Sequence, residues 1–146
     1  MTLKFLVDIC ALRLPARARA PAAVCAALRE VFQQDVQDVR VVEHSWYALL
    51  HIGMAATTRR GRIYLRGSTG HFYENHELVL HEYFHVLRQW DVRALTGVGY
   101  LVESLRRGYR QNRFEVEARA FAAANVQRYA QELARAATLA AGKRSP

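Results

Sequence analysis

Residues 75–90 read NHELVLHEYFHVLRQW, and this stretch decides how the chain folds. A helix through it is apolar almost all round, which is typical of a helix buried in the middle of a domain. The apolar positions are Leu78, Val79, Leu80, Tyr83, Phe84, Val86, Leu87 and Trp90. His81, Glu82 and His85 interrupt this surface, and burying three such groups without partners costs several kcal/mol. The stretch therefore predicts a buried helix that carries a polar site.

The polar residues of this helix form the motif HExxH, from His81 to His85. Residues four apart in a helix lie one above the other, so both imidazoles can bind the same zinc ion. Glu82 follows His81 directly and cannot point to the same place. It can instead reach a water in the open metal position and act as general base. We therefore predict Zn²⁺ as cofactor, His81 and His85 as ligands and Glu82 as a catalytic residue.

A hydrolytic zinc site needs a third protein ligand, and the residues nearest the motif do not supply one. No histidine follows His85. The extended form of the motif could end on Asp91, but Arg88 stands where that form needs a helix-breaking glycine. We therefore expect the helix to run on and to carry Asp91 away from the metal. A carboxylate on a later helix is left as the third ligand.

Glu115 is the best candidate for that carboxylate. It shares a helix face with Ala118 and Ala122, small residues that allow the HExxH helix to approach closely. Glu117 lies about 200° further round the helix, so only one of the two can face the zinc. Spacing alone leaves Glu117 open, either as the ligand or as a solvent-facing or supporting neighbour, and Glu103 is a weaker alternative. We predict Glu115 as the third ligand.

The order of elements indicates an α+β fold with a small, mostly antiparallel sheet. Besides the HExxH helix, we expect helices over 21–32, 100–107 and 112–139, and strands over 39–44 and 62–66. The sheet is expected to pack on the HExxH helix, and the last helix to carry the third ligand.

The whole chain is predicted to form one domain. Its 146 residues, 51% of them hydrophobic, are enough for one core and few for two. Residues 1–20 are assigned to an N-terminal extension or linker, 21–141 to a single minimal domain and 142–146 to a tail. Cys10 and Cys25 stand too far apart for a CxxC motif, so neither a thiolate zinc site nor a disulfide framework is indicated.

No segment indicates a membrane or a secretion signal. The chain has no run of about eighteen apolar residues. Asp8 interrupts the mildly apolar N-terminus, and no small-residue cleavage site follows it. We therefore expect a soluble cytoplasmic protein without a membrane partner, unless a dedicated system exports it.

The chain is strongly basic, with a formal net charge of +8. Only Lys4 and Lys143 are lysines among its 21 Lys and Arg residues, so 21 − 2 = 19 are arginines. Such residues are typical of solvated helix faces that pair with carboxylates. A DNA-associated protease or nucleic-acid binder is a further reading, prompted by Arg59, Arg60, Arg62, Arg66, Arg106, Arg107 and Arg110. Nucleic acid is the less favoured partner, because no helix-turn-helix signature or aromatic–basic interleaving accompanies them.

HExxH followed by E-x-x-A, from Glu115 to Ala118, resembles the gluzincin zinc metallopeptidases, in which that glutamate is the third ligand. Four ordered blocks resemble more closely the metallopeptidase domain associated with extracellular contractile injection systems. They span residues 32–41, 55–64, 81–89 and 109–118, within a resemblance over about residues 28–125. It implies a zincin-like fold, bound zinc, peptidase activity, a bacterial source and a contractile injection system or other secretion machinery as partner.

Position 119 departs from the gluzincin pattern. Many gluzincins carry Asp or Asn four residues after the ligand glutamate, where it orients a zinc-bound imidazole. Arg119 stands there and cannot accept a hydrogen bond. Another acceptor must then fix the histidine tautomer, and Glu103, Glu117 or a backbone carbonyl are the candidates.

The predicted function is that of a gluzincin-type zinc endopeptidase acting on a protein or peptide. Zinc activates a water, Glu82 takes its proton, and the water attacks the peptide carbonyl. Tyr109 is the predicted donor to the oxyanion, with Tyr100 and His71 as alternatives. Zincins of this kind bind extended substrate along a strand edge above the site helix, which would be Arg62–Arg66 here. The same residues fit an ordinary amphipathic edge strand with solvated arginines equally well.

The alternative function is a catalytically silent, zinc-stabilised binding or assembly module. Arg119 at the position of the orienting residue favours it. The shortness of the chain favours it too, because little room is left for a substrate-cleft subdomain.

Overall fold

A computed structural model describes three stretches of the chain, residues 17–49, 55–92 and 94–142. The predicted HExxH helix lies in the middle of the fold: α4 (His76–Phe84) continues into the π-helical segment η2 (His85–Trp90). Asn75 caps its start, because the Asn75 side chain accepts a hydrogen bond from the backbone N–H of Leu78. Its fully buried side chains are Val79, Leu80, Tyr83 and Val86. The prediction of a buried helix is therefore confirmed.

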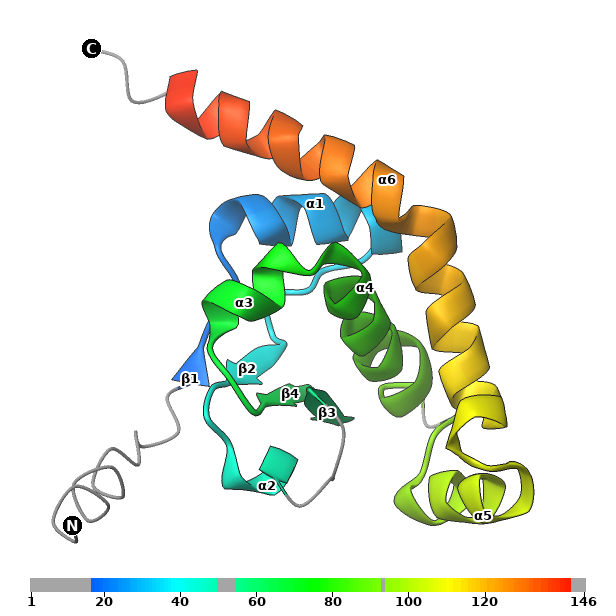
Figure 1. Cartoon of the computed structure of the whole chain (residues 1–146). Helices are drawn as coiled ribbons and strands as arrows, with labels where there is room; N and C mark the ends of the chain where they lie inside the picture. Colours follow the sequence, from blue (N-terminus) through cyan, green and yellow to red (C-terminus); the bar gives the residue numbers. More distant parts are fainter. Residues whose placement is uncertain (1–16, 50–54, 93, 143–146) are drawn as a thin grey trace, which may run out of the picture.

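Two further helices pack on α4. The helix α1 (Ala22–Phe32) begins directly after Pro21, and α6 (Arg113–Gly142) is the long C-terminal helix. On α6, the ring of Phe121 contacts both Phe32 and Phe84, with centroid distances of 4.8 and 4.9 Å. The three helices therefore share one aromatic contact, and Figure 1 shows α1 above α4 and the first half of α6 running along its right side.

The sheet lies beside the lower half of α4 (Figure 1). Its strands are β1 (Arg17–Ala18), β2 (Arg40–Val42), β3 (Ala56–Arg59) and β4 (Arg62–Leu65), in the order β1-β2-β4-β3. The β2–β4 pair is parallel and the other two pairs are antiparallel. The expectation of an α+β domain with a short, mostly antiparallel sheet is confirmed.

The free edge near α4 is β3 and not the strand predicted at 62–66. The inner strand β4 is hydrogen-bonded to β2 on one side and to β3 on the other. The turn between β3 and β4 is made by Gly61, whose φ of 67° suits glycine. The sequence of β3, ATTR, lacks the apolar alternation that marks a strand, so its pairing with β4 was missed. The expected substrate edge at Arg62–Arg66 is therefore wrong.

Several boundaries also differ from the prediction. Helix α5 (Gly97–Arg107) includes Gly97 and Gly99, because the Thr96 side chain caps it by accepting a hydrogen bond from the Gly99 N–H at 3.0 Å. The strand β1 pairs with β2, so the sheet extends into the segment assigned to a linker, and Gly142 belongs to α6. Residues 1–16 and 143–146, including Cys10, lie outside the described residues.

The other described elements are short. They are α2 (Trp46–Leu49), α3 (Thr69–Glu74) and the 3₁₀ turn η3 (Tyr109–Gln111). None of the helices within the described stretches combines the length and the apolar character that a bilayer crossing requires.

Candidate metal centre

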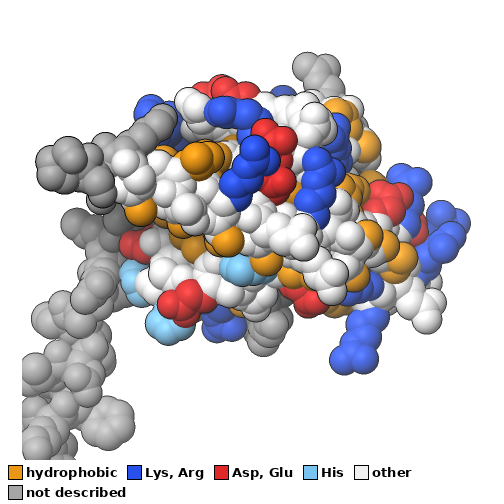
Figure 2. Space-filling view, turned by 90° about the horizontal axis from the view of Figure 1, so that it is seen from above, with side chains coloured by type: hydrophobic (Ala, Val, Ile, Leu, Met, Phe, Trp, Pro, Cys, Tyr) orange, Lys and Arg blue, Asp and Glu red, His pale blue; other side chains and the backbone are white. Residues whose placement is uncertain are grey.

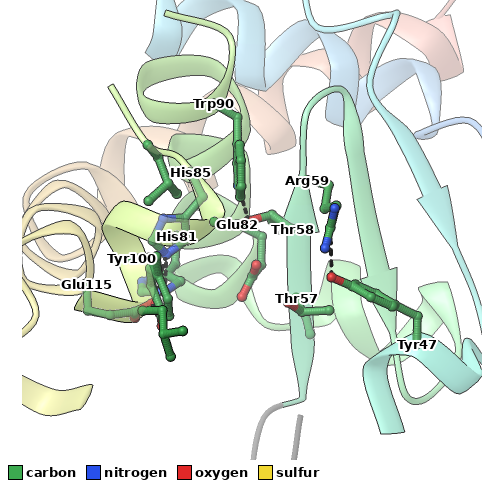
Figure 3. A pocket seen from close by; sticks show the side chains of 14 residues that line it. Tyr47, Thr57, Thr58, Arg59, His81, Glu82, His85, Trp90, Tyr100 and Glu115 are labelled. Atoms are coloured by element: carbon green, nitrogen blue, oxygen red, sulfur yellow. Dashed lines mark hydrogen bonds and ion pairs between the residues drawn. The ribbon is translucent and has the colours of Figure 1, made fainter. Parts of the chain in front are cut away.

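Three side chains from two helices meet at the predicted metal site. His81 and His85 project from α4 and η2, and Glu115 projects from the first turn of α6 (Figure 3). The Nε2 atoms of His81 and His85 are 3.0 Å apart. Glu115 Oε2 lies 3.3 Å from His81 Nε2, and Glu115 Oε1 lies 3.4 Å from His85 Nε2. The structure therefore brings together the two histidines and the glutamate that were chosen from the sequence.

The donor set fits a metal ion. In a tetrahedral zinc site with bonds of about 2.0–2.1 Å, neighbouring ligand atoms are about 3.3 Å apart, close to the separations found here. Glu115 is 2% exposed, and the described basic groups nearest to its Oε2 are the His81 imidazole at 3.3 Å and the Arg119 guanidinium at 3.8 Å. Within the described residues, this is the one group of three His, Cys, Asp or Glu side chains positioned to hold a metal.

Gln89 is the acceptor that fixes the tautomer of His85. Its side-chain NH₂ donates to the Phe114 carbonyl and to Glu117 Oε2, both at 3.1 Å. Its Oε1 is therefore free to accept from His85 Nδ1, 2.7 Å away. With the proton of the neutral imidazole on Nδ1, His85 Nε2 carries the lone pair that a metal would bind in place of the proton that it would otherwise share with Glu115.

Gln89 was missed in the sequence because amides are not among the usual metal-site partners. The available signal was its spacing, four residues after His85 and on the same helix face. Glu117 supports the site indirectly, because its Oε2 accepts a hydrogen bond from the Gln89 side chain. Glu103 is paired with Arg107 at 3.1 Å and is not among the three clustered side chains.

The centre opens into a cavity of about 360 Å³. Figure 3 shows Glu82 between the histidines and β3, on the floor of this cavity. Residues Ala56–Arg59 of β3 form one wall, and Gly97, Tyr100 and Leu101 of α5 contribute another. The indole N–H of Trp90 donates to Thr58 Oγ1 at 3.2 Å and so joins η2 to β3. The free strand edge therefore lies beside the candidate ligands.

The family of the chain follows from a comparison with known proteins. The family described as the eCIS core domain matches residues 19–93, which are 75 of the 146 residues. The chain belongs to this family. Membership associates it with extracellular contractile injection systems. The matched segment of this eCIS core domain protein contains His81, Glu82 and His85, whereas Glu115 lies beyond it. No curated protein and no solved structure matched the chain.

Burial and charge set opposite protonation preferences for the two glutamates. Burial raises the pKa of Glu82, and the nearby His85 and His81 offset this only in part. Burial also acts to raise the pKa of Glu115, but hydrogen bonds from His81 and His85 outweigh it and hold the pKa well below its usual range. Glu115 is therefore an ionised ligand, and Glu82 is a stronger base than an exposed carboxylate.

His85 is shifted in the direction expected beside a carboxylate. Burial lowers the pKa of His85, but its hydrogen bond to Glu115 and the charge of Glu82 outweigh burial, and the net shift is upward. A metal would therefore compete with a proton for this imidazole.

The candidate oxyanion donors lie at different places. The Tyr100 hydroxyl donates to Glu115 Oε1 at 2.9 Å. Tyr109 lines a second cavity, of about 540 Å³, together with His81 and Glu82. His71 lies on α3 within 2.9 Å of the Ser68 hydroxyl and lines neither cavity. Both tyrosines thus adjoin the candidate ligands, and His71 does not.

Arg119 occupies the position noted in the sequence, on the outer side of Glu115. Its guanidinium lies 3.8 Å from Glu115 Oε2 and donates a hydrogen bond to the Arg110 carbonyl. It places a positive charge next to a candidate ligand, whereas the His85 imidazole is oriented by Gln89.

Proposed function

We propose that this chain is a zinc-dependent endopeptidase. The observation that carries the proposal is the position of Glu82, a buried carboxylate on the floor of a cavity that also contains His81, His85 and Glu115. A ligand cluster, an adjacent base and a free strand edge are the parts that metal-assisted peptide hydrolysis requires.

The residues take distinct roles in this reaction. His81, His85 and Glu115 would hold the metal. Bound zinc would supply a Lewis acid that activates water and polarises a carbonyl oxygen. Glu82 would accept a proton from the attacking water and pass it to the amine nitrogen as the C–N bond breaks. Its raised pKa suits both the uptake and the release of that proton.

An extended peptide would bind along β3. The outer edge of β3 has no neighbouring strand in the described sheet, so its backbone N–H and C=O groups can pair with a peptide. Tyr109 stays our predicted donor to the developing oxyanion, and Tyr100 is the alternative because its hydroxyl already lies at the ligand cluster.

The test is the Glu82→Gln variant. We expect it to bind zinc as the wild type does, measured by metal analysis of the purified protein, because Glu82 is not a ligand. Cleavage of denatured proteins, followed by mass spectrometry, should fall by a factor of about 10²–10⁴. Glu74→Gln is the matched control, since Glu74 is exposed on α3 and outside both cavities. Hydrolysis by zinc-loaded Glu82→Gln at the wild-type rate would contradict the assigned mechanism.

A catalytically silent, zinc-stabilised binding or assembly module is the second candidate. Arg119 supports it, because a guanidinium 3.8 Å from Glu115 Oε2 competes with a metal for that carboxylate. The association of the family with contractile injection systems is also compatible with an assembly role. A wild-type protein that is stabilised by zinc but cleaves none of a diverse set of denatured proteins would favour this candidate over the endopeptidase.

A further inference from the structure

Four arginines gather around the turn that follows β3. Arg40 on β2 is the register partner of Arg62 on β4, and Arg62 is the partner of Arg59 on β3. Arg60 follows in the exposed turn. These four residues, called here the arginine row, place like charges side by side across three strands, an arrangement that weakens a sheet unless something compensates it.

The described part of the chain offers the arginine row little compensation. None of the four forms an ion pair with a described carboxylate. Arg59 instead donates to the Tyr47 hydroxyl at 2.7 Å and lies 5.2 Å from the centre of that ring. Burial raises the pKa of Asp91 and the charge of Arg60 acts against this shift, but the two side chains do not form an ion pair. The row therefore keeps a net positive charge.

Some other arginines of the described chain are paired with carboxylates. On the helical face of the molecule, Arg side chains are spread among Asp and Glu side chains (Figure 2). Arg29 pairs with Asp35 at 3.3 Å, and Arg135 lies 3.8 Å from Glu132. Arg106 and Arg128 also lack a described carboxylate partner, so the arginine row is distinguished by like charges that lie next to one another across three paired strands.

The arginine row adjoins the candidate active site. A hollow of about 420 Å³ is lined by Arg59, Arg60, Arg62, Tyr64 and Trp90. Arg59 and Trp90 also line the cavity that contains the metal ligands. In Figure 3, Arg59 lies on the far side of β3 from His81, next to Tyr47. A chain that follows β3 from the metal centre would therefore reach the row at the end of the strand.

We propose that the arginine row binds an acidic segment of the polypeptide substrate, so that the site prefers peptides with Asp or Glu residues to one side of the bond that is cut. This inference rests on the proposed endopeptidase function. Guanidinium groups bind carboxylates through paired hydrogen bonds, and the cross-strand spacing presents several of them to one extended chain.

Two observations favour an acidic peptide over nucleic acid. The free edge of β3 offers backbone groups that pair with a peptide backbone. Two of the aromatic rings near the row are already engaged, since Tyr47 and Tyr64 have ring centroids 5.0 Å apart and Arg59 lies over Tyr47. This leaves Trp46, 65% exposed, as an open ring beside Arg40 and Arg62. Binding of single-stranded nucleic acid depends on aromatic faces that are open to the bases.

The test compares two fluorescein-labelled ten-residue peptides that differ only in Glu against Gln at alternate positions. Binding to the full, zinc-loaded chain is measured by fluorescence anisotropy at low salt, in the wild type and in Glu82→Gln. We expect the Glu peptide to bind more tightly. The double variant Arg40→Gln/Arg62→Gln should weaken that binding about tenfold, since each exposed pair contributes up to about a factor of five, and should leave the Gln peptide unaffected. Arg106→Gln, on the exposed side of α5, is the matched control.

Each outcome bears on one proposal separately. Equal affinity for the Glu and Gln peptides, or an equal loss for both in the double variant, would overturn the assignment of the arginine row. An oligonucleotide that binds more tightly than the Glu peptide, and depends on Arg40 and Arg62, would replace it with a nucleic-acid site. Binding of the Glu peptide that depends on the row, by a zinc-loaded wild type that cleaves neither this peptide nor any of the denatured proteins, would leave the row assigned and contradict the endopeptidase. Thermal melts of the variants check that they fold.

Discussion

Two helical regions line the same cavity, and they are held in very different ways. The segment α4–η2 supplies His81, Glu82 and His85 and is buried between α1, α6 and the sheet. Helix α5 supplies Tyr100 and Leu101, but none of its residues is buried. The difference shows that the groups with demanding geometry lie on the packed region, where neighbouring side chains prevent them from moving.

Polar contacts hold α5 where apolar packing does not. The Asn112 side chain donates to Ser104 Oγ at 2.8 Å, and the Tyr100 hydroxyl reaches Glu115. The apolar residues of α5 face outward instead, with Val98 75% exposed and Leu105 78% exposed. The segment α4–η2 is thus held by apolar packing and α5 by a few hydrogen bonds, and substitutions in the two regions should differ in effect.

The largest effect is expected from truncating the same residue type in the two regions. Leu80→Ala on α4 removes a fully buried side chain and should lower the free energy of unfolding by about 2–5 kcal/mol. Leu105→Ala on α5 should change it by no more than about 0.5 kcal/mol, because the side chain is already in water. Urea denaturation of both variants measures the difference, and similar losses would mean that α5 is packed as tightly as α4.

A smaller effect is expected from the support of His85. Gln89→Leu preserves most of the buried volume but removes the acceptor for His85 Nδ1. We expect metal affinity to fall about 10–100-fold, as is typical when the partner of a ligand histidine is lost. Competition with a chromogenic chelator measures the affinity. Gln127→Leu, exposed on α6, is the control; unchanged affinity in folded Gln89→Leu would show that Gln89 does not orient the imidazole.

The smallest effect is expected at the tether of α5. Tyr100→Phe removes the hydrogen bond to Glu115 Oε1 and leaves the ring in place. One such bond is worth about 1 kcal/mol, so metal affinity should fall about fivefold. Tyr64→Phe, which alters a ring outside this cavity, serves as the comparison. A loss as large as that of Gln89→Leu would mean that α5 supports the ligands as strongly as η2 does.

Local patterns accounted for most of the fold. The proline before α1, the apolar surface of α4 and the long C-terminal helix were all identified from spacing within single segments. The strand β3 was not, because two threonines and an arginine carry no apolar period, and β3 exists through its pairing with β4. Gln89 was not identified either, because its role depends on oxygens of α6, 25 and 28 residues further along the chain.

The pairing of His81 with His85 was determined by the sequence alone, since any helix places residues four apart on the same face. The choice of Glu115 over Glu117 and Glu103, the orientation of His85 by Gln89 and the free edge of β3 were decided by the tertiary structure. Each of these depends on how α6 and the sheet pack against α4. That packing is set by contacts such as Phe121 against Phe32 and Phe84, between residues distant in the chain, and a local sequence pattern does not contain it.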